Sequence, residues 1–162
     1  MRSTTILVFL SVFVPILVTG CGDDSMATAG KSAQHISGQN TRWYGQDQVE
    51  RGNTLYQANC AACHKPDASG TPDWKKLDAN GKLPPPPLNG SAHTWHHPLS
   101  VLHRTVINGG IPLGGSMPAF GAKLTPQQIY DILAWVQSHW PDEIYSIWNE
   151  RNSMAQQRAR KN

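Results

Sequence analysis

The sequence Cys60-Ala-Ala-Cys63-His64 constrains this chain more than any other feature. Two thiols at positions i and i+3 lie on one helical turn, so each can add to a vinyl group of the same porphyrin. The imidazole of the next residue then reaches the iron from the same side, which is why Cys-x-x-Cys-His is the attachment motif of c-type haem. We therefore predict one covalent haem c, held by Cys60 and Cys63, with His64 as an axial ligand of the iron.

Three other interpretations of the cysteine pair explain less of the sequence. A thioredoxin-like pair does not need His64 and usually follows a strand, whereas a helical pattern precedes this pair. A structural zinc site needs four ligands, and the chain has no second cysteine pair to supply them. A disulfide between Cys60 and Cys63 would close a very tight loop and would leave the histidine unexplained.

The N-terminal region has the pattern of a secretory signal. Arg2 precedes an uncharged, mostly apolar run from Ile6 to Val18, and small residues follow this run. An uncleaved transmembrane anchor is the alternative, because a spanning helix needs about 20 mostly apolar residues. Pro15 and the polar residues at both ends of the run favour the cleaved signal.

The residues Val-Thr-Gly-Cys at 18–21 resemble the lipobox of bacterial lipoproteins. In that motif the cysteine takes a diacylglyceryl group and becomes the mature N-terminus. We expect a lipoprotein signal peptide at residues 1–20 and a lipid on Cys21 that anchors the chain to a membrane. A free or disulfide-bonded Cys21 behind an ordinary cleavage site is the alternative. Residues 21–41 lack periodicity and have almost no large apolar side chains, so they are predicted to be a flexible tether.

Two further segments have the pattern of helices that pack on a core. The first ends at the Cys-x-x-Cys-His motif and spaces its apolar residues for one helical face: Val49, Leu55, Tyr56 and Cys60. The second begins with Thr125 as an N-cap, Pro126 at the first helical position, and Gln128 as the partner in a capping box. Its predicted apolar face consists of Ile129, Ile132, Leu133 and Val136.

With these features the chain resembles the class I c-type cytochromes from Trp43 to Pro141. In that family an N-terminal helix with a glycine and an aromatic residue crosses a C-terminal helix. Gly52 and Tyr56 match the first helix, and Leu-Ala-Trp-Val at 133–136 matches the second. The resemblance implies an all-α, cytochrome c-like helical fold around one covalently bound haem, with the cytochrome c domain at residues 42–141. It also implies an electron carrier and not an enzyme.

The resemblance assigns further residues to the haem site. Pro86-Pro87-Leu88 is similar to the family's Pro-x-Leu, in which the proline carbonyl accepts a hydrogen bond from the axial histidine and fixes its tautomer. Gly-Gly-Ser-Met-Pro-Ala-Phe at 114–120 resembles the family's Met-Pro-x-Phe loop, which implies that Met117 is the second axial ligand. Trp95 is expected to pack near the haem. The rival ligands for the second position are His93, His96, His97 and His103.

The histidines on either side of Trp95 allow another interpretation. Three histidines in the segment His93–His97 would ordinarily suggest copper or zinc, although a surface loop that leads into a helix at 99–107 is the simpler interpretation. A copper-handling or sensor module is therefore one alternative function. A haem peroxidase-like enzyme is another, but such enzymes of this family usually carry a second Cys-x-x-Cys-His, and this chain has one.

Length and charge exclude some classes of function. The chain has 162 residues and a formal net charge of +3, with no long basic block before its last few residues, so nucleic-acid binding is not expected. Residues 142–162 are predicted to be an accessory C-terminal extension, in which Ile144, Ile147 and Trp148 share one helical face. We expect a lipid-anchored protein on the periplasmic side of a bacterial membrane. Its expected redox partners are a respiratory complex, an oxidase or a copper protein.

Overall fold

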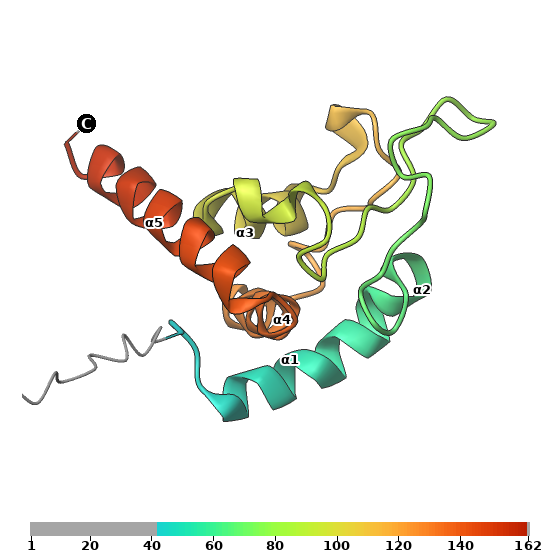
Figure 1. The fold of residues 1–162 in the computed structure, drawn as a ribbon. Helices are drawn as coiled ribbons and strands as arrows, with labels where there is room; N and C mark the ends of the chain where they lie inside the picture. The colour runs from blue at the N-terminus through green and yellow to red at the C-terminus, as the bar shows by residue number, and fades with distance from the viewer. Residues whose placement is uncertain (1–41, 162) are drawn as a thin grey trace, which may run out of the picture. The chain divides into compact units, whose positions relative to one another are not determined.

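The computed structural model describes residues 42–161, which all belong to one compact unit. Within these residues the regular structure is helical, without strands (Figure 1). The α-helices are α1 (Gln46–Asn59), α2 (Ala61–His64), α3 (Leu99–Asn108), α4 (Pro126–Ser138) and α5 (Asp142–Ala159), and the 3₁₀ helices are η1 (His93–His96) and η2 (Ile111–Leu113). The predicted all-α fold is confirmed. The predicted signal peptide, Cys21 and the tether lie outside the described residues.

The crossing of α1 and α4 forms the centre of the fold. Gly52 of α1 packs directly on the backbone of α4, and a β-carbon at this position would overlap the Asp131 carbonyl. One turn later, the Tyr56 ring is completely buried and its centroid lies 4.0 Å from that of Trp135. The glycine and aromatic residue predicted from the sequence therefore make the helix contact, because the missing side chain at Gly52 lets the two backbones approach.

The start of α4 has the predicted capping box. The Gln128 N–H donates to Thr125 Oγ1 at 3.3 Å, and the Thr125 N–H donates to Gln128 Oε1 at 2.9 Å, with Pro126 at the first helical position. The four residues of the predicted apolar face are all buried: Ile129, Ile132, Leu133 and Val136. Asp131 is buried as well, and its carboxylate pairs with Arg51 of α1 at 3.0 Å. The α1–α4 contact thus combines apolar packing with one ion pair.

The C-terminal helix α5 packs back on the domain. Tyr145 and Trp148 are completely buried, and the Trp148 indole N–H donates to the His97 carbonyl at 2.9 Å. The prediction that Ile147 shares the inward face was wrong, since this side chain is 41% exposed. Hydrogen bonds and aromatic contacts rotate the helix so that Tyr145, Trp148 and Asn152 face inward. None of the described helices is long and apolar enough to cross a membrane.

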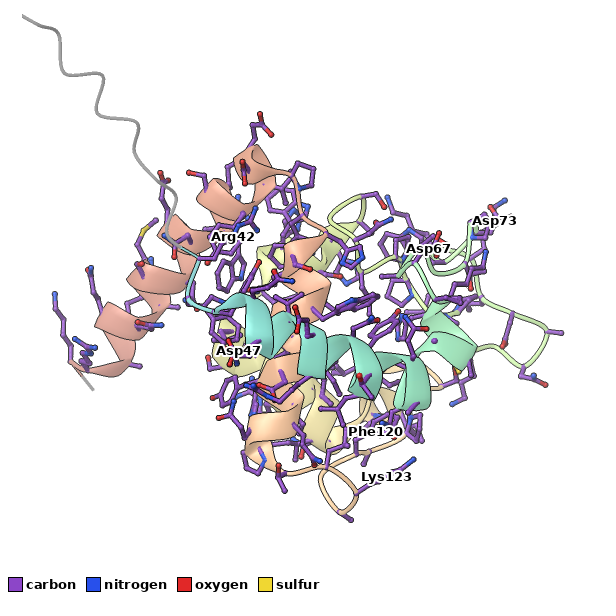
Figure 2. The ribbon with its side chains drawn as sticks, turned by 90° about the horizontal axis from the view of Figure 1, so that it is seen from below. Arg42, Asp47, Asp67, Asp73, Phe120 and Lys123 are labelled. Atoms are coloured by element: carbon purple, nitrogen blue, oxygen red, sulfur yellow. The ribbon has the colours of Figure 1, made fainter. Side chains whose placement is uncertain are left out.

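Arg42 joins the beginning of the described chain to the α4–α5 corner. Its guanidinium donates to the Gln137 carbonyl at 2.9 Å and to the Asp142 carboxylate at 2.5 Å, and it lies 4.0 Å above the Tyr145 ring. Figure 2 shows Arg42 beside this corner. The first described residue is therefore attached to the C-terminal part of the domain, although most of the sequence separates the two.

Candidate haem site

The Cys-x-x-Cys-His residues lie where α1 passes into α2. The Cys60 N–H donates to the Tyr56 carbonyl at 2.8 Å, and the His64 N–H donates to the Cys60 carbonyl at 2.9 Å, so the motif is wound into one helical turn. Both thiols are free; Cys60 is half-buried and Cys63 is exposed. The imidazole of His64 is only 8% exposed. Two free thiols and a buried imidazole on one turn form the donor set that covalent haem attachment requires.

A hydrogen bond defines the tautomer of His64. Its Nδ1 lies 2.9 Å from the Pro86 carbonyl oxygen, which can only accept. Nδ1 therefore carries the proton, and Nε2 is the nitrogen with a lone pair for a metal. Burial lowers the pKa of His64 more than the Pro86 carbonyl raises it, so the imidazole is neutral, as a metal ligand must be. The acceptor is the carbonyl oxygen of Pro86 and not that of a neighbouring proline.

The two thiols differ in their surroundings. Burial raises the pKa of the Cys60 thiol to about 11, with a smaller contribution from the neighbouring Cys63 and an opposing one from the positive charge of Lys123. Cys60 is therefore fully protonated at neutral pH in the haem-free chain. Cys63 is exposed to solvent. The two sulfurs that would bind the porphyrin thus differ in exposure: Cys60 is half-buried and Cys63 is exposed.

The loop that carries Met117 is attached to the end of α3. The Gly110 N–H donates to the Met117 carbonyl at 2.9 Å, and the Phe120 N–H donates to the Val106 carbonyl at 3.0 Å. Gly109 has a φ of +77°, and a β-carbon there would lie 2.7 Å from the Met117 carbonyl oxygen. Glycine is therefore required both for this backbone conformation and for the close approach of the loop. Coordination by Met117 stays a prediction.

Exposed apolar side chains gather between this loop and the proline run. The Leu83 N–H donates to the Gly114 carbonyl at 3.1 Å, so the segment after α2 and the segment after α3 run side by side (Figure 1). Leu83, Ile111 and Leu113 on these segments are exposed, the last of them by 73%. Soluble proteins rarely leave such side chains together in water without a partner. An exposed apolar surface of this kind is one that a haem, which is a large apolar group, could cover.

The other residues predicted for the site lie on or beside η1 and on α3, and a place for Trp95 near the haem stays a prediction. Trp95 is half-buried against the core, and the Arg151 guanidinium of α5 lies 5.2 Å above its ring. His93 stacks on Trp74 with ring centroids 4.8 Å apart, and His103 stacks on Tyr130 with centroids 4.4 Å apart.

The predicted surface loop around these histidines is instead the 3₁₀ helix η1, whose Thr94 is buried. Across the described part of the chain, no group of three or more His, Cys, Asp or Glu residues is placed to hold a metal ion. The histidines of the copper alternative therefore do not come together as a ligand set.

Two residues at the site had no role in the sequence analysis. Thr94 donates from Oγ1 to the Pro87 carbonyl at 3.2 Å, and Gly70 donates from its N–H to the His64 carbonyl at 2.9 Å. Gly70 has a φ of +60°, and its position soon after the haem motif was the one signal in the sequence that could have found it. Thr94 has no such signal, because its contact depends on where η1 packs.

Comparisons with known proteins match this part of the chain. The family described as "Cytochrome C oxidase, cbb3-type, subunit III" matches residues 47–136, a range that begins in α1 and ends in α4. A "Gluconate 2-dehydrogenase cytochrome c subunit" of Pantoea cypripedii is 32% identical over 104 residues, which cover 60% of this chain and 22% of the relative. A "Cbb3-type cytochrome c oxidase subunit CcoP" of Azospirillum brasilense is 29% identical over 128 residues, which cover 77% of this chain and 41% of the relative. The chain thus spans less than half the length of either relative. No solved structure matches it.

Proposed function

We propose that this chain, which belongs to the cytochrome c family described as cytochrome c oxidase, cbb3-type, subunit III, carries single electrons through one haem c held by Cys60, Cys63 and His64. When bound, haem c supplies an iron that accepts and releases one electron. The family itself implies haem c and electron transfer. The observation that carries the assignment to these residues is the single helical turn with two free thiols and a buried imidazole whose Nδ1 faces Pro86.

In this proposal each residue has a separate task. The sulfurs of Cys60 and Cys63 hold the cofactor permanently, so that it is not lost between reactions with two partners. His64 binds the iron through Nε2, and Pro86 keeps the ring in the required tautomer. Burial around His64 keeps water away from this ligand.

We propose Met117 as the second axial ligand. Its loop is attached to α3 by backbone hydrogen bonds, and Gly109 lets this loop approach α3 closely. A ligand held in this way moves little when the charge of the iron changes, which favours rapid electron transfer. A thioether also favours the ferrous state and raises the potential. Occupation of both axial positions would suit an electron carrier better than an enzyme that binds a substrate at the iron.

The proposed partners come from the names of the relatives. One relative is a subunit of a cbb3-type cytochrome c oxidase and another is the cytochrome c subunit of a gluconate 2-dehydrogenase. We propose that this chain likewise exchanges electrons with a respiratory oxidase or dehydrogenase. We also propose that a lipid on Cys21 and a tether at residues 21–41 hold the domain near the periplasmic face of a membrane. Twenty residues of flexible chain have an r.m.s. span of about 25 Å.

Covalent haem attachment tests the central proposal. After denaturing electrophoresis, haem staining should stay with the wild-type protein and disappear when both Cys60→Ala and Cys63→Ala are present. His64→Ala should change the reduced-minus-oxidised spectrum of the haem that is attached, because it removes a ligand of the iron. The proposal fails if the wild-type protein releases its haem on denaturation.

A further inference from the structure

The run Pro84–Pro87 is a row of hydrogen-bond acceptors. Proline has no backbone N–H, so this segment can accept hydrogen bonds but cannot donate them. Three successive carbonyls face three different parts of the molecule. The Pro85 carbonyl accepts from the Thr71 N–H at 2.9 Å, the Pro86 carbonyl faces His64 Nδ1 at 2.9 Å, and the Pro87 carbonyl accepts from Thr94 Oγ1 at 3.2 Å. The acceptor of His64 is therefore held on both sides by groups outside the run.

Gly70 contacts both partners of the hydrogen bond between His64 and Pro86. Its N–H donates to the His64 carbonyl at 2.9 Å. Its α-carbon packs on the Pro86–Pro87 peptide, because a β-carbon at Gly70 would overlap this peptide and lie 2.6 Å from the Pro86 carbonyl oxygen. Ordinary contacts between such atoms are about 3.5–4.0 Å. Any side chain at Gly70 must therefore displace the Pro86 carbonyl or Gly70 itself by roughly 1 Å.

We propose that Gly70 and Thr94 are positioning residues that set the hydrogen bond from His64 Nδ1 to Pro86 and thereby tune the reduction potential. This inference rests on the proposed function, because it takes His64 as the iron ligand. A hydrogen bond from Nδ1 makes the imidazole a stronger donor to the metal, and this stabilises the ferric state. The observed 2.9 Å is already the preferred length for such a bond. Displacement of Pro86 in any direction therefore weakens the bond and raises the potential.

Two variants perturb the acceptor in different ways. Thr94→Val keeps the shape of the buried side chain and removes the hydroxyl that holds the Pro87 carbonyl. We expect the equilibrium constant for reduction to rise about threefold. The variant weakens the hydrogen bond from His64 to Pro86 without removing it, so the effect is smaller than the net contribution of a whole hydrogen bond. For one electron the threefold change corresponds to about 28 mV, at 59 mV per tenfold change. Gly70→Ala should change the potential in the same direction and by more, because it displaces the peptide directly.

Each variant has a matched control. Gly81 also has a left-handed φ, +70° against +60° for Gly70, but no atom lies within 4 Å of a β-carbon built there. Gly81→Ala therefore introduces the same kind of backbone strain without contact with Pro86. Thr105 donates from Oγ1 to the Val101 carbonyl at 2.9 Å within α3, so Thr105→Val removes a comparable hydroxyl bond away from the proline run.

The experiment uses the full-length, haem-loaded protein. Potentials are measured by redox titration of the absorption spectrum, and the His64 Nδ1 proton is followed by NMR through its chemical shift and its exchange with solvent. We expect higher potentials and faster exchange in Thr94→Val and Gly70→Ala, with wild-type values in both controls. If Gly70→Ala does not acquire haem, Thr94→Val alone decides the question.

The outcomes separate the two proposals. Attached haem with wild-type potential and exchange in Thr94→Val would overturn the positioning role and leave the proposed function intact. A wild-type protein without covalent haem, or one whose spectrum does not respond to His64→Ala, would overturn the proposed function itself. A rise in potential in the controls equal to that in the two test variants would also overturn the positioning role, because any loss of packing would then have the same effect.

Discussion

Replacing Asn152 by alanine tests whether α5 is a structural part of the cytochrome domain. Asn152 is 7% exposed, and its Oδ1 accepts a hydrogen bond from the Leu99 N–H, the first amide of α3, at 3.0 Å. Pro98 occupies the N-cap position of α3 and has no side-chain acceptor of its own. Asn152 therefore supplies from α5 the cap that the sequence before α3 lacks.

The expected change in the free energy of unfolding has one contribution from α3 and one from α5. Loss of an N-cap acceptor costs about 0.5–2 kcal/mol, and a buried N–H without a partner costs about 1–3 kcal/mol. We take about 1.5 kcal/mol for the lost cap. Alanine is favoured over asparagine within a helix by about 0.5 kcal/mol, which offsets part of this loss. The free energy of unfolding should therefore fall by about 1 kcal/mol, and Tm by about 4 °C for a domain of this size.

Urea unfolding of the haem-loaded protein, followed by far-ultraviolet circular dichroism, measures this difference. Asn149→Ala is the control, because it makes the same substitution on the same helix, one turn away from the residue that accepts from Leu99. Asn152→Asp keeps an acceptor oxygen, and its charge suits the positive end of α3, so it should be at least as stable as wild type. If Asn152→Ala and Asn149→Ala unfold at the same urea concentration, Asn152 does not cap α3, and α5 stabilises the domain only through its packing.

Three further predictions concern the haem ligands and the anchor. Met117→Ala should lose the thioether-to-ferric-iron band near the red end of the oxidised spectrum and lower the potential; an unchanged spectrum would transfer the ligand role to a histidine. In the haem-free chain, iodoacetamide should label Cys60 more slowly than Cys63 at pH 8, and the Cys60 rate should rise about tenfold per pH unit until the pH nears its pKa of about 11, because only the thiolate reacts. If peptide mass spectrometry finds that the two cysteines are labelled at equal rates at pH 8, burial does not protect the Cys60 thiol. Mass spectrometry of the membrane fraction should find an acylated peptide that begins at Cys21, and a mature chain that retains earlier residues would exclude the lipid anchor.

Features that depend on residues close in sequence could be predicted without the structure. The Thr125–Gln128 capping box and the apolar face that follows it need only helical periodicity, and both lie where the sequence indicated. The same holds for Gly52 and Tyr56, whose spacing by one turn places them on one face of α1. The donors of the haem motif are likewise adjacent in sequence, so their common turn follows from local geometry.

Contacts between distant segments were decided only by the tertiary structure. The Leu99 N–H donates to Asn152 and Arg42 donates to the Gln137 carbonyl because separate parts of the chain pack in one arrangement, and no local pattern encodes these pairs. The inward face of α5 is the clearest case.

Apolar spacing alone predicted Ile147 inside, but Trp148 needs an acceptor for its indole N–H once it is buried, and it finds one in the His97 carbonyl. Asn152 likewise enters the core because α3 leaves its first amide without a cap. A short motif thus predicts where a haem would be attached, whereas the rotation of α5 and the position of Pro86 depend on polar groups that must find partners after the helices pack.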